Sequence, residues 1–217
     1  MNLSSELVPR LRGVSHAWAL WFALVAACVL ALYAPTGLAR ASALVYGVGL
    51  TALFAASGLY HRWRWNPRWR PLLRRIDHSA IFVFIAASYT PVALLVLSGS
   101  LQVVVLASVW AGALAGVAMS VAWITAPRVL VAVSYLALGW VAVVAMPQLA
   151  HSLGVAPLVL FAAGGLLYSL GAIVYALRRP NPWPRTFGFH EIFHALVILA
   201  AVVHFVAMAG WVIPAGG

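Results

Sequence analysis

The sequence predicts an all-α integral membrane protein, a seven-transmembrane helix bundle with its N-terminus in the cytoplasm and its C-terminus outside. Of the 217 residues, 65% are hydrophobic and only 7% are charged, whereas an ordinary soluble domain carries about 25% charged residues. The apolar residues form seven continuous runs, each near the roughly 20 residues that a helix needs to cross a bilayer. These runs do not alternate with polar residues, which excludes a transmembrane β-barrel.

Polar breaks that contain Arg or Pro separate the apolar runs and set the order of the spans in a single domain, 1–217. The first run follows Arg10 and Arg12, and Ala39-Arg40-Ala41 resembles a signal-peptide cleavage site. Its apolar stretch is too long for a signal sequence, so we assign it as the first span. The predicted spans lie near 17–36, 41–60, 79–97, 101–123, 129–147, 155–177 and 190–213.

The distribution of arginine predicts the orientation. With seven spans the loops alternate between the two sides of the membrane, and 12 of the 13 Arg residues then fall on one side. Only Arg40 falls on the other side. Positively charged loops favour the cytoplasm, which places the N-terminus inside. Six or eight spans would spoil this asymmetry.

The basic loop 62–76 interleaves Arg with Trp63, Trp65 and Trp69. Trp rings favour the headgroup level of a membrane, and guanidinium groups bind lipid phosphate. We therefore expect membrane lipids with anionic headgroups as partners of this loop. The formal net charge of +10 could also indicate nucleic acid binding. Membrane topology and binding of anionic lipid already explain this charge, so we do not expect nucleic acid as a partner.

Ionisable groups at membrane depth are costly, and they are functional candidates by default. His61 closes the second predicted span, Asp77 opens the third, and His190 and His194 open the seventh. The topology brings all four to the cytoplasmic ends of their helices. The single Cys28 offers no thiolate cluster, so any metal must be held by His and carboxylate.

The spacing of His190 and His194 is the strongest local signal. At i and i+4 on a helix, both imidazoles project from one face and can bind a single ion. Adding His61 gives three neutral nitrogen ligands, a set that a catalytic Zn²⁺ commonly uses with a fourth position open for water. Asp77 could orient or deprotonate that water. Ser57 lies one turn before His61, where its hydroxyl could donate a hydrogen bond or polarise a substrate carbonyl.

Other interpretations exist for each of these residues taken singly. His61 could be an interfacial residue, Ser57 a packing residue, and Asp77 a helix N-cap before Ser79. The conjunction of two of the three acids and three of the seven His at one membrane level favours a site.

The four remaining His residues are weaker candidates. His78 is adjacent to Asp77 and should point elsewhere. His204 lies about 15 Å deeper than His194 and is equally suited to an interhelical hydrogen bond. We expect His16 and His151 to be loop or interface residues.

Four motifs then carry a family resemblance over nearly the whole chain. They are Ser57-Gly58-Leu59-Tyr60-His61, Asp77-His78-Ser79-Ala80-Ile81-Phe82 with Tyr89-Thr90-Pro91, Gly164-Gly165-Leu166-Leu167-Tyr168-Ser169-Leu170-Gly171, and His190-Glu191-Ile192-Phe193-His194. Together they resemble the bacterial hemolysin III family of the progestin and adipoQ receptor superfamily. The name of that family refers to a cell-lysing phenotype.

The resemblance implies a seven-helix bundle with a cytoplasmic N-terminus and a zinc ion held by His61, His190 and His194. It further implies that Asp77 contacts the water of the metal and that Ser57 lies beside it. Relatives in this and neighbouring families are linked to hydrolysis of ceramide-like lipid amides, and the bacterial branch to membrane lipid homeostasis. These implications place the protein in a bacterial inner membrane.

Glu191 departs from the expected family pattern, because it turns HxxxH into HExxH, the zincin signature in which the Glu acts as general base. No acid follows Glu191, and His204 is too deep to be a third ligand. A membrane metalloprotease is therefore a distant alternative.

The preferred hypothesis is a zinc-dependent hydrolase of lipid amides or esters. A receptor-like or regulatory membrane protein with a structural zinc is the alternative. Closed structural sites use four protein ligands, and Asp77 is the obvious fourth.

Overall fold

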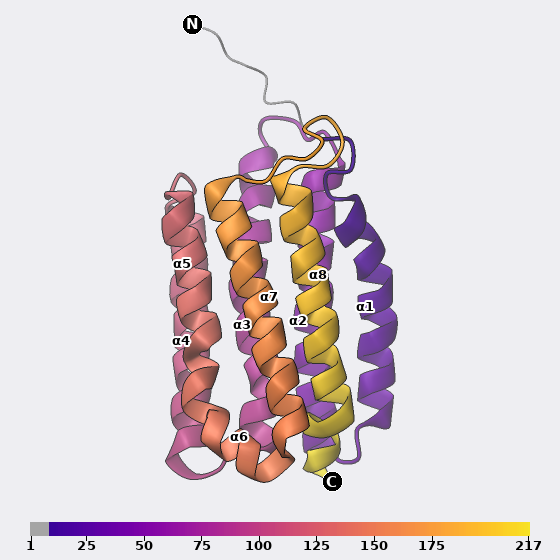
Figure 1. The fold of residues 1–217 in the computed structure, drawn as a ribbon, viewed down its shortest axis with the longest axis vertical. Coiled ribbons are helices and arrows are strands. Elements are labelled where there is room, and N and C mark those ends of the chain that lie inside the picture. Colours follow the sequence, from indigo (N-terminus) through magenta and orange to yellow (C-terminus); the bar gives the residue numbers. More distant parts are fainter. Residues whose placement is uncertain (1–8) are drawn as a thin grey trace, which may run out of the picture.

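The computed structural model describes residues 9–217 as helices that run along one long axis of the molecule (Figure 1). Seven segments in this part of the chain are long and apolar enough to cross a membrane. The fifth comprises α5, η1 and α6, and the seventh comprises α8, η2 and η3. The elements are α1 (Val14–Tyr33), α2 (Gly37–Arg62), α3 (Arg70–Leu95), α4 (Gly99–Ala122), α5 (Arg128–Gly139), η1 (Trp140–Ala145), α6 (Met146–Leu153), α7 (Val155–Leu177), α8 (Phe189–Ala207), η2 (Met208–Val212) and η3 (Pro214–Gly216).

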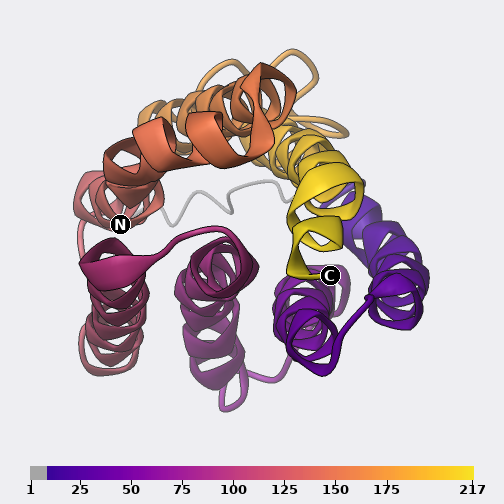
Figure 2. The same cartoon turned by 90° about the horizontal axis from the view of Figure 1, so that it is seen from below.

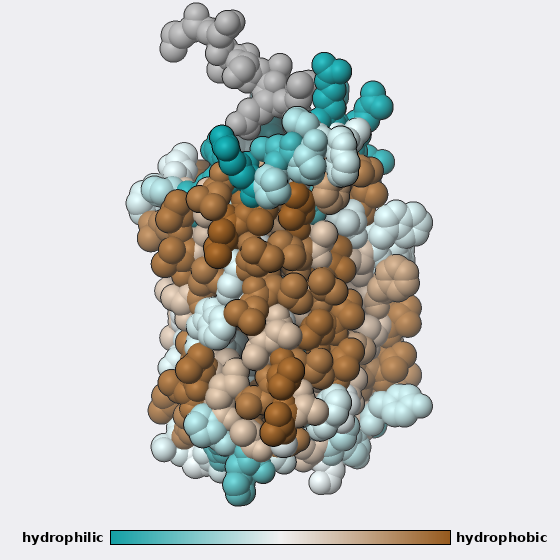
Figure 3. All heavy atoms as spheres, viewed as in Figure 1, coloured by the Kyte–Doolittle hydropathy of each residue, from teal (hydrophilic) through white to brown (hydrophobic). Residues whose placement is uncertain are grey.

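The two ends of the bundle differ in polarity. We call the end formed by residues 9–13, 63–69, 123–127 and 178–188 the basic end, because 12 of the 13 Arg residues lie in these segments or in the adjoining helical turns. Hydrophilic side chains gather there above a broad hydrophobic belt (Figure 3). The C-terminus lies at the opposite end (Figure 1). This polarity is the one expected of a chain that places its Arg residues on one side of a bilayer.

Among the helix boundaries that differ from the predicted spans, two have clear local reasons. The first helix ends at Tyr33 instead of 36, because Pro35 disfavours helical backbone in the residue before it. The third helix begins at Arg70, nine residues before the predicted start at 79. Pro71 fits its first turn, where a missing N–H leaves no intrahelical bond unmade. The polar residues 70–78, which precede the apolar run, are thus part of the third helix.

The helices surround a common interior (Figure 2). Sequence neighbours pack against each other from α1 to α4, α7 packs against α5 and α8, and α8 also contacts α1. Small residues allow the closest approach: a Cβ added at Gly47 would lie 2.5 Å from the Cβ of Ala27. Such contacts are typical of helices packed in a membrane.

The fifth span is interrupted, where a continuous helix over 129–147 was expected. After Gly139 the backbone changes to the 3-10 segment η1. The hydroxyl of Tyr89 donates to the Gly139 carbonyl and accepts from the Ala142 N–H at 2.7 Å. Irregular backbone at membrane depth requires such partners. An α3 side chain therefore stabilises the interruption of a different span.

Candidate metal centre

Three helices bring the candidate residues together at the basic end. His61 lies in the last turn of α2, which ends at Arg62, and His190 and His194 lie in the first two turns of α8. Asp77 lies seven residues after the start of α3, about two turns into that helix.

The three His side chains form a group that could hold a metal ion. Their candidate ligand nitrogens all lie within 4.8 Å of one another. The Nε2 atoms of His61 and His190 are 3.2 Å apart, close to the roughly 3.3 Å that separates two ligands in a tetrahedral site with Zn–N distances of about 2.0–2.1 Å. His194 Nδ1 is buried and makes no hydrogen bond within residues 9–217. Three imidazole nitrogens that lie this close together are a donor set that zinc commonly uses, so the group fits zinc.

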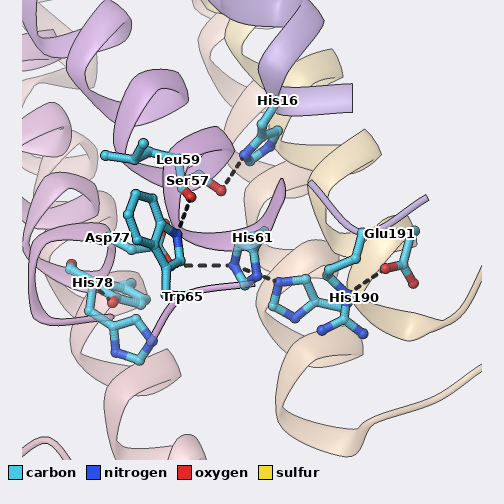
Figure 4. Close-up of polar contacts among 11 residues, drawn as sticks. His16, Ser57, Leu59, His61, Trp65, Asp77, His78, His190 and Glu191 are labelled. Carbon is cyan, nitrogen blue, oxygen red and sulfur yellow. Dashed lines mark hydrogen bonds and ion pairs between the residues drawn. The ribbon is translucent and has the colours of Figure 1, made fainter. Parts of the chain in front are cut away.

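Asp77 lies beside this group. Its Oδ2 atom is 3.4 Å from His61 Nε2, the same nitrogen that faces His190, and His61 lies between Asp77 and His190 (Figure 4). The residue is only 7% exposed. The alternative that Asp77 caps a helix N-terminus is wrong, because α3 begins at Arg70. Its carboxylate is therefore available to an ion held by the His group or to a water next to it.

Ser57 is held by a residue that the sequence analysis missed. The expectation that His16 lies in a loop or at the interface is wrong, since His16 is in the first turn of α1 and only 2% exposed. Its Nδ1 atom is 2.7 Å from Ser57 Oγ (Figure 4). Its ring stacks on that of His194 with centroids 3.8 Å apart. The first two helices are antiparallel, so His16 at the start of α1 lies at the same level as His61 at the end of α2. The order of the predicted spans could therefore have indicated His16 as a site residue.

Glu191 is directed away from His61 (Figure 4). Its Oε1 accepts a hydrogen bond from Arg12, and its Oε2 accepts from the Gly188 N–H at 2.8 Å. Glu191 thus caps the helix that carries two of the His residues. This position does not suit the general base of a zincin.

The other His residues lie outside the group. The ring of His78 lies apart from His61 and His190 (Figure 4). His204 Nε2 is 3.2 Å from the Phe161 carbonyl in α7, an interhelical hydrogen bond of the kind expected for it. His151 is exposed in the last turn of α6.

A cavity of about 180 Å³ joins the candidate site to the interior of the bundle. Asp77, Ser57 and the three His of the group lie on its wall at the basic end, and Met208 lies on its wall near the other end. Met208 follows His194 by 14 residues, a helical rise of about 21 Å. Leu53, Ile81 and Val197 are among the apolar residues between them. The geometry thus joins a polar, titratable site to a long and largely apolar space.

Comparison with known proteins decides the family. A family model described as Haemolysin-III related matches residues 5–205. The chain belongs to the haemolysin-III related family. It is 34% identical to the Hemolysin-3 homolog of Bacillus subtilis over 154 residues, which is 71% of this chain and 69% of the relative. It is 32% identical to Hemolysin-3 of Bacillus cereus over 170 residues, 78% of this chain and 74% of the relative.

The haemolysin-III related family connects the chain to the adipoQ receptor proteins. Over 46 residues it is 56% identical to the Adiponectin receptor protein of Drosophila melanogaster, which covers 19% of this chain and 10% of the relative. The resemblance noted in the sequence is confirmed at the family level. With seven apolar helices of membrane-spanning length, the chain is a multi-pass membrane protein, and its bacterial relatives point to the cell membrane.

Proposed function

We propose that this protein is a zinc-dependent membrane hydrolase that cleaves an amide or ester of a lipid, with a role in membrane lipid homeostasis. The observation that carries the proposal is the opening of one cavity onto His61, His190, His194 and Asp77 at the basic end. A water-soluble substrate would not bind favourably in an apolar space that continues about 21 Å into the bundle, whereas a lipid chain would.

The His group would hold the ion. Zinc, when bound, supplies a Lewis acid that activates water near neutral pH and polarises a carbonyl. Asp77, which lies beside the His group, would take a proton from the attacking water and return it to the leaving group, as in ordinary general acid–base catalysis. Asp77 and His194 are buried, and electrostatic interactions are stronger in such a low-dielectric surrounding than in bulk water.

The cavity wall and the basic end suggest how a lipid would bind. The apolar residues of the cavity wall, among them Leu53 and Met208, would accommodate an acyl chain. The polar end of the cavity would bind the amide or ester linkage next to the headgroup. Trp63 and Trp69 in the loop beside the site are each 59% exposed. We propose that this Arg- and Trp-containing loop contacts anionic headgroups.

A regulatory or receptor-like protein with a structural zinc is the second candidate. The distance of 3.4 Å between Asp77 Oδ2 and His61 Nε2 favours it, because a small movement would make the carboxylate a fourth ligand. The candidate ligand nitrogens of the three His lie within 4.8 Å of one another, and Asp77 is outside this set, which supports an open fourth position and the hydrolase.

The test combines a lipid-extract hydrolysis screen with metal measurement on wild type and Asp77→Asn. The Asn side chain keeps the shape but cannot accept a proton, so we expect zinc to be retained and turnover to fall by about a hundredfold or more. Loss of zinc from Asp77→Asn would mark a closed structural site and contradict the hydrolase. Unchanged turnover would contradict it as well.

A further inference from the structure

The contacts of His16 fix which of its ring nitrogens carries hydrogen. Its Nε2 atom is 3.3 Å from the backbone carbonyl oxygen of His194. A carbonyl oxygen only accepts hydrogen bonds, so Nε2 must be the donor. Within residues 9–217, no carboxylate forms a hydrogen bond or ion pair with His16. Asp77 attracts a positive charge on His16, but burial of the ring is the larger effect and favours the neutral form, which leaves Nδ1 as an acceptor.

The state of His16 determines how Ser57 is oriented. Because Nδ1 accepts, the Ser57 hydroxyl donates its only hydrogen to His16 across 2.7 Å. The Ser57 oxygen then has only lone pairs left for other partners. Ser57 lies on the wall of the cavity, one turn before His61. It therefore presents an acceptor to the site, whereas the sequence alone suggested a donor to a substrate carbonyl.

We propose that His16 is a positioning residue that holds Ser57 in this orientation, so that Ser57 Oγ accepts a hydrogen bond from an N–H or O–H group of the reactants. The donor is either the attacking water or a group on the lipid next to the scissile bond. The catalytic role of Ser57 in this inference rests on the proposed hydrolase. The hydrogen bonds that join His16 to Ser57 and to the His194 carbonyl require neither zinc nor substrate.

The arrangement can be measured directly by ¹⁵N NMR on histidine-labelled full-length protein in nanodiscs. His16 should show a protonated Nε2 and an unprotonated Nδ1, assigned by loss of the signals in His16→Asn. Ser57→Ala should move the Nδ1 signal, and Ser57→Thr, which keeps a hydroxyl, should restore it. Ser88→Ala is the matched control, because Ser88 also lines the cavity but donates to the Ile85 carbonyl. A protonated Nδ1, or an Nδ1 signal that Ser57→Ala leaves unmoved, would overturn the proposal.

A second measurement uses the zinc-loaded enzyme and a lipid amide found by the hydrolysis screen. Ser57→Ala should keep its zinc and lose about tenfold in kcat, the effect of one hydrogen bond. Adding His16→Asn to Ser57→Ala should cost little more, because both act through one contact. Additive losses would overturn the proposal, and so would an acyl adduct on Ser57 in mass spectrometry, which would make Ser57 a nucleophile.

Comparing the N–H amide with its N-methyl counterpart identifies the donor. If Ser57→Ala matters less for the N-methyl substrate, the lipid N–H is the donor. If it matters equally for both, the donor is the water. If no lipid is cleaved by the wild type, the proposed function fails while the NMR result still decides the orientation of Ser57.

Discussion

Arg12 Nε donates a hydrogen bond to Glu191 Oε1, joining two residues that are 179 positions apart. The pair fastens the segment before α1 to the first turn of α8, the helix that carries His190 and His194. The backbone N–H of Leu11 also donates to the Thr186 carbonyl at 3.2 Å. The position of α8 thus depends on the first residues that the structure describes.

We expect the two halves of this ion pair to differ in their contribution to stability. Arg12→Ala leaves a charged carboxylate that is 3% exposed, and it should lower the free energy of unfolding by about 3 kcal/mol. Glu191→Gln removes the charge but keeps an acceptor for the Gly188 N–H, so it should cost about 1 kcal/mol. Thermal unfolding in detergent measures both, with Arg10→Ala at an exposed neighbouring position as the control.

The same Glu191→Gln variant tests the zincin alternative. Because Glu191 is directed away from His61, its substitution should leave zinc and hydrolysis largely intact. Turnover that is lost in Glu191→Gln and kept in Asp77→Asn would instead favour zincin-like chemistry.

Metal content provides the most direct test of the His group. We expect about one Zn²⁺ per purified chain, and His61→Ala, His190→Ala and His194→Ala should each lose most of it. His151→Ala, at an exposed position in α6, should lose none. Equal metal in the wild type and in the triple variant would show that the assignment is wrong.

Much of this fold could be predicted from the sequence because its signals are local. Length and apolarity predict each span, and the spacing of His190 and His194 places both rings on one face. The interruption after Gly139 could not be predicted, because the partner that stabilises it, Tyr89, lies in another helix. His16 was missed for a similar reason: its partner Ser57 is 41 residues away, and one polar residue at the start of an apolar run has no periodic signal.

Tyr89→Phe tests how much the Tyr89 hydroxyl stabilises the interruption of the fifth span after Gly139. Without the hydroxyl, the Gly139 carbonyl and the Ala142 N–H lose a partner at membrane depth. We expect a loss of about 2 kcal/mol in the free energy of unfolding, measured in detergent against Tyr33→Phe, which removes an exposed hydroxyl. A Tyr89→Phe protein as stable as that control would mean that water or lipid replaces the hydroxyl.

Cysteine labelling tests the orientation after Cys28→Ser. Gly217→Cys should react with an impermeant reagent in intact cells, because 12 of the 13 Arg residues then lie inside. Asn66→Cys, in the exposed loop between α2 and α3, should react only after the cells are opened. The opposite pattern would reverse the orientation.

The burial of Asp77 and Glu191 has an electrostatic consequence for self-association. These are the two acidic residues of the described chain, and both are inside the protein. Among the Asp, Glu and Arg residues that the structure describes, only Arg therefore lies on the surface. Two copies that met through the described surfaces of their basic ends would bring Arg against Arg, and this repulsion should weaken as the salt concentration rises.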